Sequence, residues 1–269
     1  MLECVVNVSE GRDAGVLAEL SASVSGALLD VHSDPHHNRS VFTLVGEDAP
    51  RTLTTRCVET LRIDSHEGVH PRLGVVDVVP FVPLAGSTFA DAVRARDEYA
   101  AWVAGTHGVP AFLYGTGATL PQLRREAWNG RLPDAGPAKP HPTAGAVCVG
   151  ARTVLVAYNV WLDSPDPGPA RRIAAAVRTG HVRTLGLVTG THTQVSMNLI
   201  EPAAEGPAGV VDRIIPLAAQ EGVAVLRCEL VGLLPAGVLA GIPRERWNDL
   251  DVSESRTIEA RLEAAGISR

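Results

Sequence analysis

The sequence predicts an α/β (α+β) fold in which two similar α/β sandwich subdomains each contain a mainly antiparallel sheet with helices. The order strand–helix–strand–strand–helix–strand occurs in both halves of the chain, and 269 residues suffice for two small domains. The composition is aliphatic, with only 4% aromatic residues, which suits helices packed on sheets. We expect the subdomains at residues 1–150 and 151–269.

Hydrophobic periodicity defines the elements of the first half. A helical pattern of apolar residues begins at Val16, and Pro50 is compatible with the first turn of the next helix. Ser87 is the expected N-cap of the third helix, with Asp91 one position beyond the ideal capping-box acid. The expected strands are 2–8, 28–31, 40–45, 75–82 and 111–114, and the expected helices are 16–28, 49–63, 88–105 and 122–127.

A loop at residues 128–143, rich in proline and glycine, separates this half from the second. A loop of this length in a compact chain is either a domain linker or a binding loop. After it the same alternation of patterns returns. The expected strands are 151–162, 182–189, 193–199 and 223–234, and the expected helices are 168–179, 207–221 and 252–264.

Composition argues against several classes of protein. The formal net charge is −6 and there is no basic block, so we expect no nucleic-acid partner. We also expect no membrane association, because no apolar run is long enough to span a bilayer and the N-terminus does not resemble a signal peptide. The cysteines are far apart and lie in apolar contexts, which favours a cytoplasmic location.

The stretch Ser65–Asp77 contains two histidines, two acids and an arginine among glycine and proline. His66–His70 fits the zinc-protease pattern H-E-x-x-H, which requires a helix to bring both imidazoles to one metal. Gly68 costs about 1 kcal/mol inside a helix, and the ring of Pro71 would add about 3 kcal/mol. We therefore interpret this stretch as a loop and expect no metal site.

Within such a loop, His70 can take or give a proton near neutral pH, and Arg72 can clamp a carboxylate through two parallel hydrogen bonds. This pair suggests proton transfer on a carboxylate-bearing substrate, although a solvated surface loop explains the same residues. A second polar cluster at residues 32–39 is either a hairpin loop or another wall of the same cleft.

Short stretches along nearly the whole chain resemble, in order, the formiminotransferase family. Each stretch is weakly diagnostic alone, whereas their order is specific. The matching residues are Glu3–Val5, Asn7–Gly11, Asn38–Gly46, His66, Gly68, His70–Val78, Pro80–Pro83, Tyr114–Gly115, Gly150–Arg152, Gln194–Leu199, Leu230–Leu233 and Pro235.

This resemblance implies transfer of the formimino group from N-formiminoglutamate to tetrahydrofolate, the co-substrate, during histidine degradation. It also implies a homodimer, a ligand cleft between the two subdomains, small-molecule substrates as partners and no metal. The catalytic histidine of the family's His-Pro-Arg motif is His70 here. The folate-contacting loop, which matches well only at its edges, corresponds to Gly136, Pro137, Ala138, Lys139, Pro140, His141, Pro142, Thr143, Ala144 and Gly145.

The chemistry of this transfer agrees with the residue types. N5 of tetrahydrofolate attacks an amidine carbon and sheds a proton, while the leaving glutamate nitrogen gains one, so a single histidine can serve as base and then acid. Arg39 and Arg72 are candidates to hold substrate carboxylates. Asp77 either orients the histidine, faces the amidinium or is a structural acid. Asn7 and Asn38 either form hydrogen bonds at the cleft or have structural turn roles.

One departure from the family pattern leaves the donor open. Many members carry a glutamate where this chain has Val69, and a charge beside the catalytic base helps to stabilise its protonated form. Its loss favours, as alternatives, an enzyme of the same fold that uses another formimino or one-carbon donor, or a non-catalytic folate-binding module.

Overall fold

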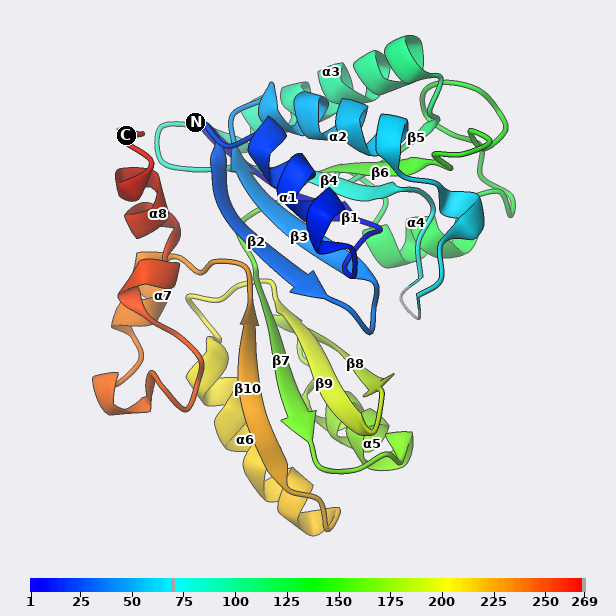
Figure 1. Ribbon diagram of the computed structural model, residues 1–269. Coiled ribbons are helices and arrows are strands. Elements are labelled where there is room, and N and C mark those ends of the chain that lie inside the picture. The colour runs from blue at the N-terminus through cyan, green and yellow to red at the C-terminus, as the bar shows by residue number, and fades with distance from the viewer. Residues whose placement is uncertain (69–70, 268–269) are drawn as a thin grey trace. The chain divides into compact units, whose positions relative to one another are not determined.

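The computed structural model describes residues 1–68 and 71–267 (Figure 1). Contacts divide the chain into two compact units, one ending at Thr153 and the other beginning at Val154. Each unit has its own sheet, its own helices and its own apolar core. Both sheets are mainly antiparallel, so the predicted fold class is confirmed. In the described part of the chain, no helix combines the length and apolar character that a membrane crossing requires.

The first unit contains a six-stranded sheet with the order β2-β3-β1-β4-β6-β5. The pairs on the β2 side are antiparallel, whereas β6 runs parallel to both β4 and β5. The strands are β1 (Leu2–Val8), β2 (Leu28–Asp34), β3 (Arg39–Val45), β4 (Val76–Pro83), β5 (Ala111–Tyr114) and β6 (Val147–Ala151).

Helices cover both faces of this sheet unequally (Figure 1). The helices α1 (Ala14–Ser23), α2 (Ala49–Thr60) and α3 (Phe89–His107) pack on one face and form the main core with alternate strand residues. The short helix α4 (Leu120–Glu126) packs on the opposite face, where Leu123 contacts a smaller apolar cluster of β4, β5 and β6. A single 3-10 turn, Ile63–Ser65, follows α2.

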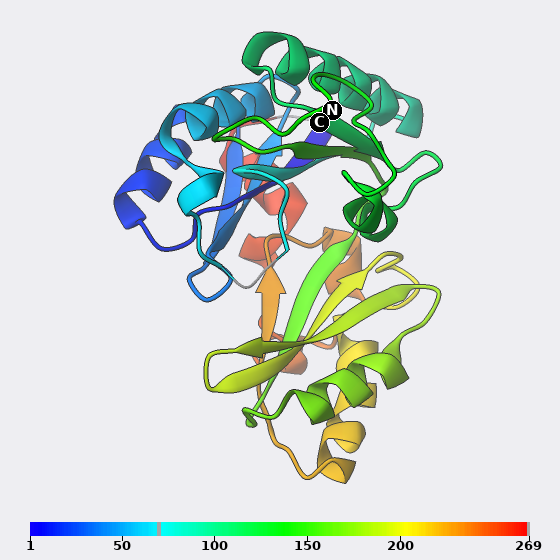
Figure 2. The ribbon, with the colours of Figure 1, turned by 90° about the vertical axis from the view of Figure 1, so that its right-hand side faces the viewer.

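The second unit is a four-stranded antiparallel sheet with the order β10-β7-β9-β8. Its strands are β7 (Val156–Leu162), β8 (Val182–Thr189), β9 (His192–Leu199) and β10 (Val225–Val231). The helices α5 (Pro167–Val177) and α6 (Pro207–Gln220) cover one face, as Figure 2 shows, and bury the apolar residues of that face. The C-terminal segment adds α7 (Ala236–Ala240), α8 (Ile258–Ala264) and two 3-10 turns, Arg244–Arg246 and Glu254–Arg256.

Several expected boundaries were wrong. The expected strand 151–162 is in fact two strands, because β6 ends at Ala151 in the first sheet and β7 begins at Val156 in the second. The N-cap of α3 is Thr88 instead of Ser87, which puts Asp91 at the third helical position and completes a capping box.

Two helices also begin or end elsewhere than expected. The first helix stops at Ser23, where the backbone turns through 3-10-type bonds such as that from Val24 N to Ser21 O, so its apolar pattern outlasts the helix. The C-terminal helix begins only at Ile258, after a 3-10 turn, with Thr257 as its N-cap.

Candidate functional site

Polar side chains of the first unit converge on one small pocket. Four of the residues named from the sequence, Asn38, Arg39, Arg72 and Asp77, lie in its lining together with Ser9 and His37. The two polar clusters of the sequence, residues 32–39 and 65–77, are therefore brought together. Asn7 lies within β1, opposite Val41 and Val78, and is not among the described residues that line the pocket. The catalytic and binding roles stay predictions.

Asn38 fixes the turn between β2 and β3 by linking it to two other segments. Its φ of 49° lies in the left-handed region, which asparagine tolerates better than most residues. Its Oδ1 accepts a hydrogen bond from the backbone N of Gly11 at 2.9 Å, and its Nδ2 donates to the carbonyl of Glu67 at 2.9 Å. Because the side chain is buried, these two bonds serve to hold the pocket walls together.

We expect Asn38→Gly to destabilise the protein by about 1–3 kcal/mol, because the buried N–H of Gly11 would lose its acceptor while the backbone conformation stays allowed. The free energy of unfolding in urea measures this cost. Asn38→Asp keeps an acceptor for Gly11 but places a carboxylate oxygen against the carbonyl of Glu67, so it should also unfold at a lower urea concentration than the wild type. Stability of Asn38→Gly equal to that of the wild type would show that the two bonds do not support the pocket.

Arg72 and His66 hold the segment that precedes β4. The guanidinium of Arg72 donates to the carbonyls of Gly68 and His66 at 2.9 and 3.0 Å, so the chain curls back on itself. The imidazole Nε2 of His66 donates to the carbonyl of Asn38 at 2.9 Å. Burial is the largest influence on the pKa of His66 and lowers it, which favours the neutral ring. His66 therefore supports the turn at Asn38.

Asp34 and His37 contact each other within that turn. His37 Nδ1 lies 2.8 Å from Asp34 Oδ2, and the backbone N–H groups of His36 and His37 donate to Asp34 Oδ1. Burial alone would raise the pKa of Asp34, but the hydrogen bonds from His37 and the charge of its ring outweigh it, so the pKa is lowered. Asp34 is thus a carboxylate at neutral pH, and it keeps the His37 side chain at the pocket.

Asp77 is buried at the start of β4, with 1% of its surface exposed, and is paired with an arginine that the sequence did not reveal. Arg124 of α4 contacts both carboxylate oxygens, at 3.2 and 2.5 Å, and the N–H of Leu73 donates to Oδ1 at 2.8 Å. Asp77 was expected to orient the histidine, to face the amidinium or to be a structural acid. These contacts favour the structural role, in which Asp77 organises the segment between His70 and β4.

Arginine side chains give the pocket an excess of positive charge. Arg39 and Arg72 line it together with one carboxylate, that of Asp77, which also pairs with Arg124. Burial lowers the pKa of Arg39, while the charges of Asp77 and Asp34 act in the opposite direction. An excess of positive charge in a pocket favours an anionic ligand.

His70, the predicted catalytic residue, and Val69 lie outside the described residues. The residues on both sides are described: Gly68 approaches the turn at Asn38, and Pro71 is held through its carbonyl by Arg124 at 2.8 Å. The described part of the H-E-x-x-H string, His66–Gly68, is not helical, as expected from its glycine and the following proline. Within residues 1–68 and 71–267, no three histidine, cysteine or acidic side chains are grouped as a metal site requires.

The predicted folate loop, residues 136–145, lies against the segment that leads into β4. Its C-terminal part is bonded to that segment through the bond from Val75 N to Ala144 O, and the next residue of the chain, Ala146, donates to Leu73 O. His141 and Gly145 exchange backbone hydrogen bonds, and His141 Nδ1 accepts from the N–H of Ala144 at 3.0 Å. The stretch 136–140 is exposed. The loop thus has a fixed base and an exposed tip, which is compatible with the predicted binding role.

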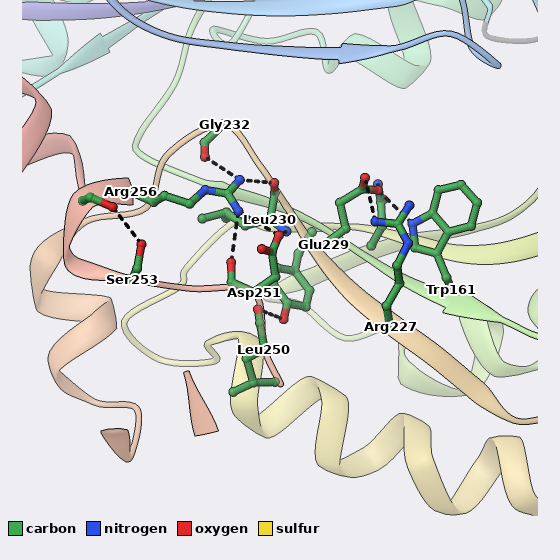
Figure 3. A network of polar contacts seen from close by, with 12 residues as sticks. Trp161, Arg227, Glu229, Leu230, Gly232, Leu250, Asp251, Ser253 and Arg256 are labelled. Atoms are coloured by element: carbon green, nitrogen blue, oxygen red, sulfur yellow. Dashed lines mark hydrogen bonds and ion pairs between the residues drawn. The ribbon is translucent and has the colours of Figure 1, made fainter. Parts of the chain in front are cut away.

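The second unit carries its own polar network, for which the sequence analysis predicted no role (Figure 3). Glu229 on β10 accepts hydrogen bonds from Asn159 and Trp161 on β7, both at 2.9 Å. The guanidinium of Arg227 lies 4.3 Å from the centroid of the Trp161 ring, within cation–π range. These contacts link the side chains of the two neighbouring strands.

A second part of this network fastens the C-terminal segment to β10 (Figure 3). Arg256 forms an ion pair with Asp251 at 2.7 Å and donates to the carbonyls of Leu230 and Gly232. The carboxylate of Asp251 in turn accepts from the N–H of Leu230 at 2.9 Å. A pocket beside it, lined by residues of the segment 247–256, has a volume of about 220 Å³. Because Arg256 bridges the segment to the strand, we assign it a structural role.

Comparison with known proteins identifies the family. The model of the formiminotransferase domain, N-terminal subdomain, matches residues 1–152. Glutamate formimidoyltransferase of Streptococcus pyogenes serotype M1 is 35% identical over 273 residues, covering 90% of this chain and 91% of that protein. The protein of the same name from Thermoplasma acidophilum is 30% identical over 301 residues, covering 98% of both chains.

The similarity extends to larger proteins. Formimidoyltransferase-cyclodeaminase of Sus scrofa is 33% identical over 276 residues, which cover 89% of this chain and 51% of that protein. The order of short motifs, the confirmed fold class and these full-length similarities agree with one another. The chain belongs to the formiminotransferase family.

Proposed function

We propose that the protein transfers the formimino group of N-formiminoglutamate to N5 of tetrahydrofolate and so produces 5-formiminotetrahydrofolate and glutamate. The observation that carries this proposal is the convergence of Asn38, Arg39, Arg72 and Asp77 on one pocket. In the sequence, Arg72 follows His70 by two positions. The names of the relatives support the reaction class, because two of them that align over nearly their whole length are glutamate formimidoyltransferases.

The proposed mechanism assigns both proton transfers to His70. The N5 lone pair attacks the amidine carbon and forms a tetrahedral intermediate, and neutral His70 accepts the N5 proton. The protonated imidazole then donates that proton to the glutamate nitrogen as the bond between carbon and that nitrogen breaks. Atoms and charges balance with tetrahydrofolate and the donor alone, because the proton removed from one nitrogen is delivered to the other.

Arg39 and Arg72 are the proposed partners of the donor carboxylates. N-formiminoglutamate carries two carboxylates, so the excess of guanidinium groups in the pocket lining complements its charge. Asn38 shapes this wall through the bonds described above. For Asn7 we propose a place at the rim, since it lies in β1 two positions before Ser9, which does line the pocket.

Residues Gly136–Gly145 are the proposed contact for tetrahydrofolate. The support is the attachment of this loop to the segment 71–75, which directly follows His70. A loop that is fixed at its base and exposed at residues 136–140 can contact a ligand beside the catalytic histidine without rearrangement of the core. We further propose that the enzyme acts in histidine degradation, in the cytoplasm and as a homodimer, in line with the family resemblance; sedimentation measures the last of these.

A panel of donors tests the proposed function. Purified protein is incubated with tetrahydrofolate and either N-formiminoglutamate, N-formiminoglycine or N-formylglutamate, and the folate product is followed by absorbance. The proposal expects the highest kcat/KM with N-formiminoglutamate. Preference for another donor would favour the second candidate, an enzyme of altered donor choice, which the presence of Val69 in place of the family's glutamate suggests. Tetrahydrofolate binding without turnover of any donor would contradict both.

A further inference from the structure

The segment that connects His70 to β4 is folded around one guanidinium–carboxylate pair. Arg124, which lies on α4 and is 47 residues from Asp77 in sequence, provides the guanidinium. Its Nη1 donates to the carbonyl of Pro71 at 2.8 Å and contacts Asp77 Oδ1 at 3.2 Å, while Nη2 contacts Asp77 Oδ2 at 2.5 Å. The N–H of Leu73 completes the arrangement through Asp77 Oδ1 at 2.8 Å. Both ends and the middle of residues 71–77 are therefore held by one pair.

This pair lies where solvent screens it little. The side chain of Asp77 is 2% exposed and that of Arg124 is 19% exposed. A buried carboxylate needs a partner that satisfies both oxygens, and a guanidinium does this through its fork. Burial acts to lower the pKa of Arg124, but the charge and hydrogen bonds of Asp77 outweigh it and raise the pKa overall. Arg124 thus stays charged throughout the accessible pH range.

The helix that carries Arg124 has its own, separate attachment to the unit. Leu123 is fully buried against the apolar cluster that includes Phe112 and Cys148, and Thr119 caps the first turn. Figure 1 shows α4 on the face of the sheet opposite α3. The Arg124 guanidinium, in contrast, forms its hydrogen bonds within the described part of the chain with Pro71 and Asp77. The side chain is accordingly placed to act on the segment after His70 rather than to hold the helix.

We propose that Arg124 is a positioning residue for the proposed transfer reaction. It acts through Pro71 and Asp77 to hold residues 71–77, which directly follow His70, beside the pocket. Fixing the carbonyl of Pro71 restricts the residue that directly follows His70, and fixing Asp77 sets where β4 begins. Since an error of about 1 Å in the position of a catalytic group can cost on the order of 10²-fold in rate, such a restraint contributes to kcat. This inference rests on the proposed function, because the reaction whose rate Arg124 affects is the proposed transfer.

A neighbouring arginine provides a matched control. Arg125 is the next residue of α4, carries the same charge and is exposed. We expect Arg124→Gln to lower kcat by about 10- to 100-fold with little change in the KM for either substrate, and Arg125→Gln to leave both constants unchanged. A loss confined to kcat is the mark of a misplaced catalytic group, whereas general destabilisation at a temperature well below melting would move neither constant.

A double-mutant cycle tests whether the pair acts as a unit. If Arg124 works through Asp77, the variant combining Arg124→Gln with Asp77→Asn is no slower than the slower of the two single variants. Rate losses that multiply, or an Arg124→Gln enzyme as fast as Arg125→Gln, would overturn the proposal.

Hydrogen exchange gives a readout that does not depend on the reaction. Arg124→Gln should speed exchange in the peptide covering residues 66–77, where Leu73 N–H is bonded to Asp77, and leave exchange in the first strand near the wild-type rate. If the wild-type protein transfers no formimino group, the proposed function is rejected. Faster exchange of this peptide in Arg124→Gln would even then show that Arg124 restrains residues 71–77. Unchanged exchange would reject the positioning role whatever the activity.

Discussion

Replacing His70 by alanine is expected to reduce formimino transfer by about 10²- to 10⁴-fold, the range that general acid–base catalysis contributes. The variant loses both the acceptor for the N5 proton and the donor for the leaving nitrogen. Its KM values should change less than kcat, because the proposed substrate contacts, Arg39 and Arg72, remain in place. Steady-state kinetics with N-formiminoglutamate and tetrahydrofolate measure the effect.

A second histidine in the neighbouring turn serves as the control. His36 is exposed, and its backbone N–H, which alanine keeps, donates to Asp34, so His36→Ala should retain wild-type kcat. Binding of the stable analogue 5-formyltetrahydrofolate, measured by calorimetry, should be preserved in both variants. A His70→Ala enzyme with kcat within threefold of the wild type would remove His70 from the mechanism.

Replacing Gly68 by alanine is expected to displace the segment at Gly68 from the turn that lines the pocket. A Cβ at this position would lie 2.5 Å from the carbonyl oxygen of His37, 3.0 Å from His66 Cε1 and 3.1 Å from Asn38 Cβ. The nearest atom belongs to the backbone of a turn that Asn38 holds in place, so the segment at Gly68 has to move away. We expect a loss of about 1–3 kcal/mol in the free energy of unfolding and a fall in kcat/KM of at least tenfold.

Gly26 is a suitable control for this substitution, because an added Cβ there would have no atom within 4 Å and its backbone conformation is an ordinary one. Gly26→Ala should leave kcat/KM unchanged. Urea unfolding and kinetics on the two variants give the comparison. If Gly68→Ala matched Gly26→Ala in both, the close approach of the segment to the turn would not matter for function.

Much of the fold was predictable because the chain carries regular patterns. Strand β1 and strand β8 were expected at their exact bounds, since apolar runs and turn residues delimit them locally. The small strand β6 was missed because its sequence, Val-Cys-Val-Gly-Ala, adjoins another apolar run. Its separation from β7 depends on parallel pairing with β4 and β5, which are distant in sequence. Pairing of this kind leaves no local signal.

The candidate site was predictable to a similar extent. Asn38, Arg39, Arg72 and Asp77 were expected from two polar clusters, and the structure brings them to one pocket. Ser9 and His37 were not named individually as lining residues, although Ser9 lies in the matched stretch Asn7–Gly11 and His37 lies in the polar cluster 32–39.

Arg124 was missed for another reason: it belongs to a short helix and meets Asp77 only through the tertiary fold. A weak local signal exists, since a carboxylate at the start of a buried strand requires a buried cation. The sequence does not say which of the many arginines supplies it.

Transfer of doubly labelled donor tests the central claim most directly. N-formiminoglutamate labelled with ¹³C and ¹⁵N in the formimino group is incubated with the protein and tetrahydrofolate, and the products are identified by NMR and mass spectrometry. The account predicts that both labels appear together in the folate product, one for each glutamate released, and that this product is lost in His70→Ala. Release of glutamate with the labels in formamide or ammonia, and none on the folate, would contradict it.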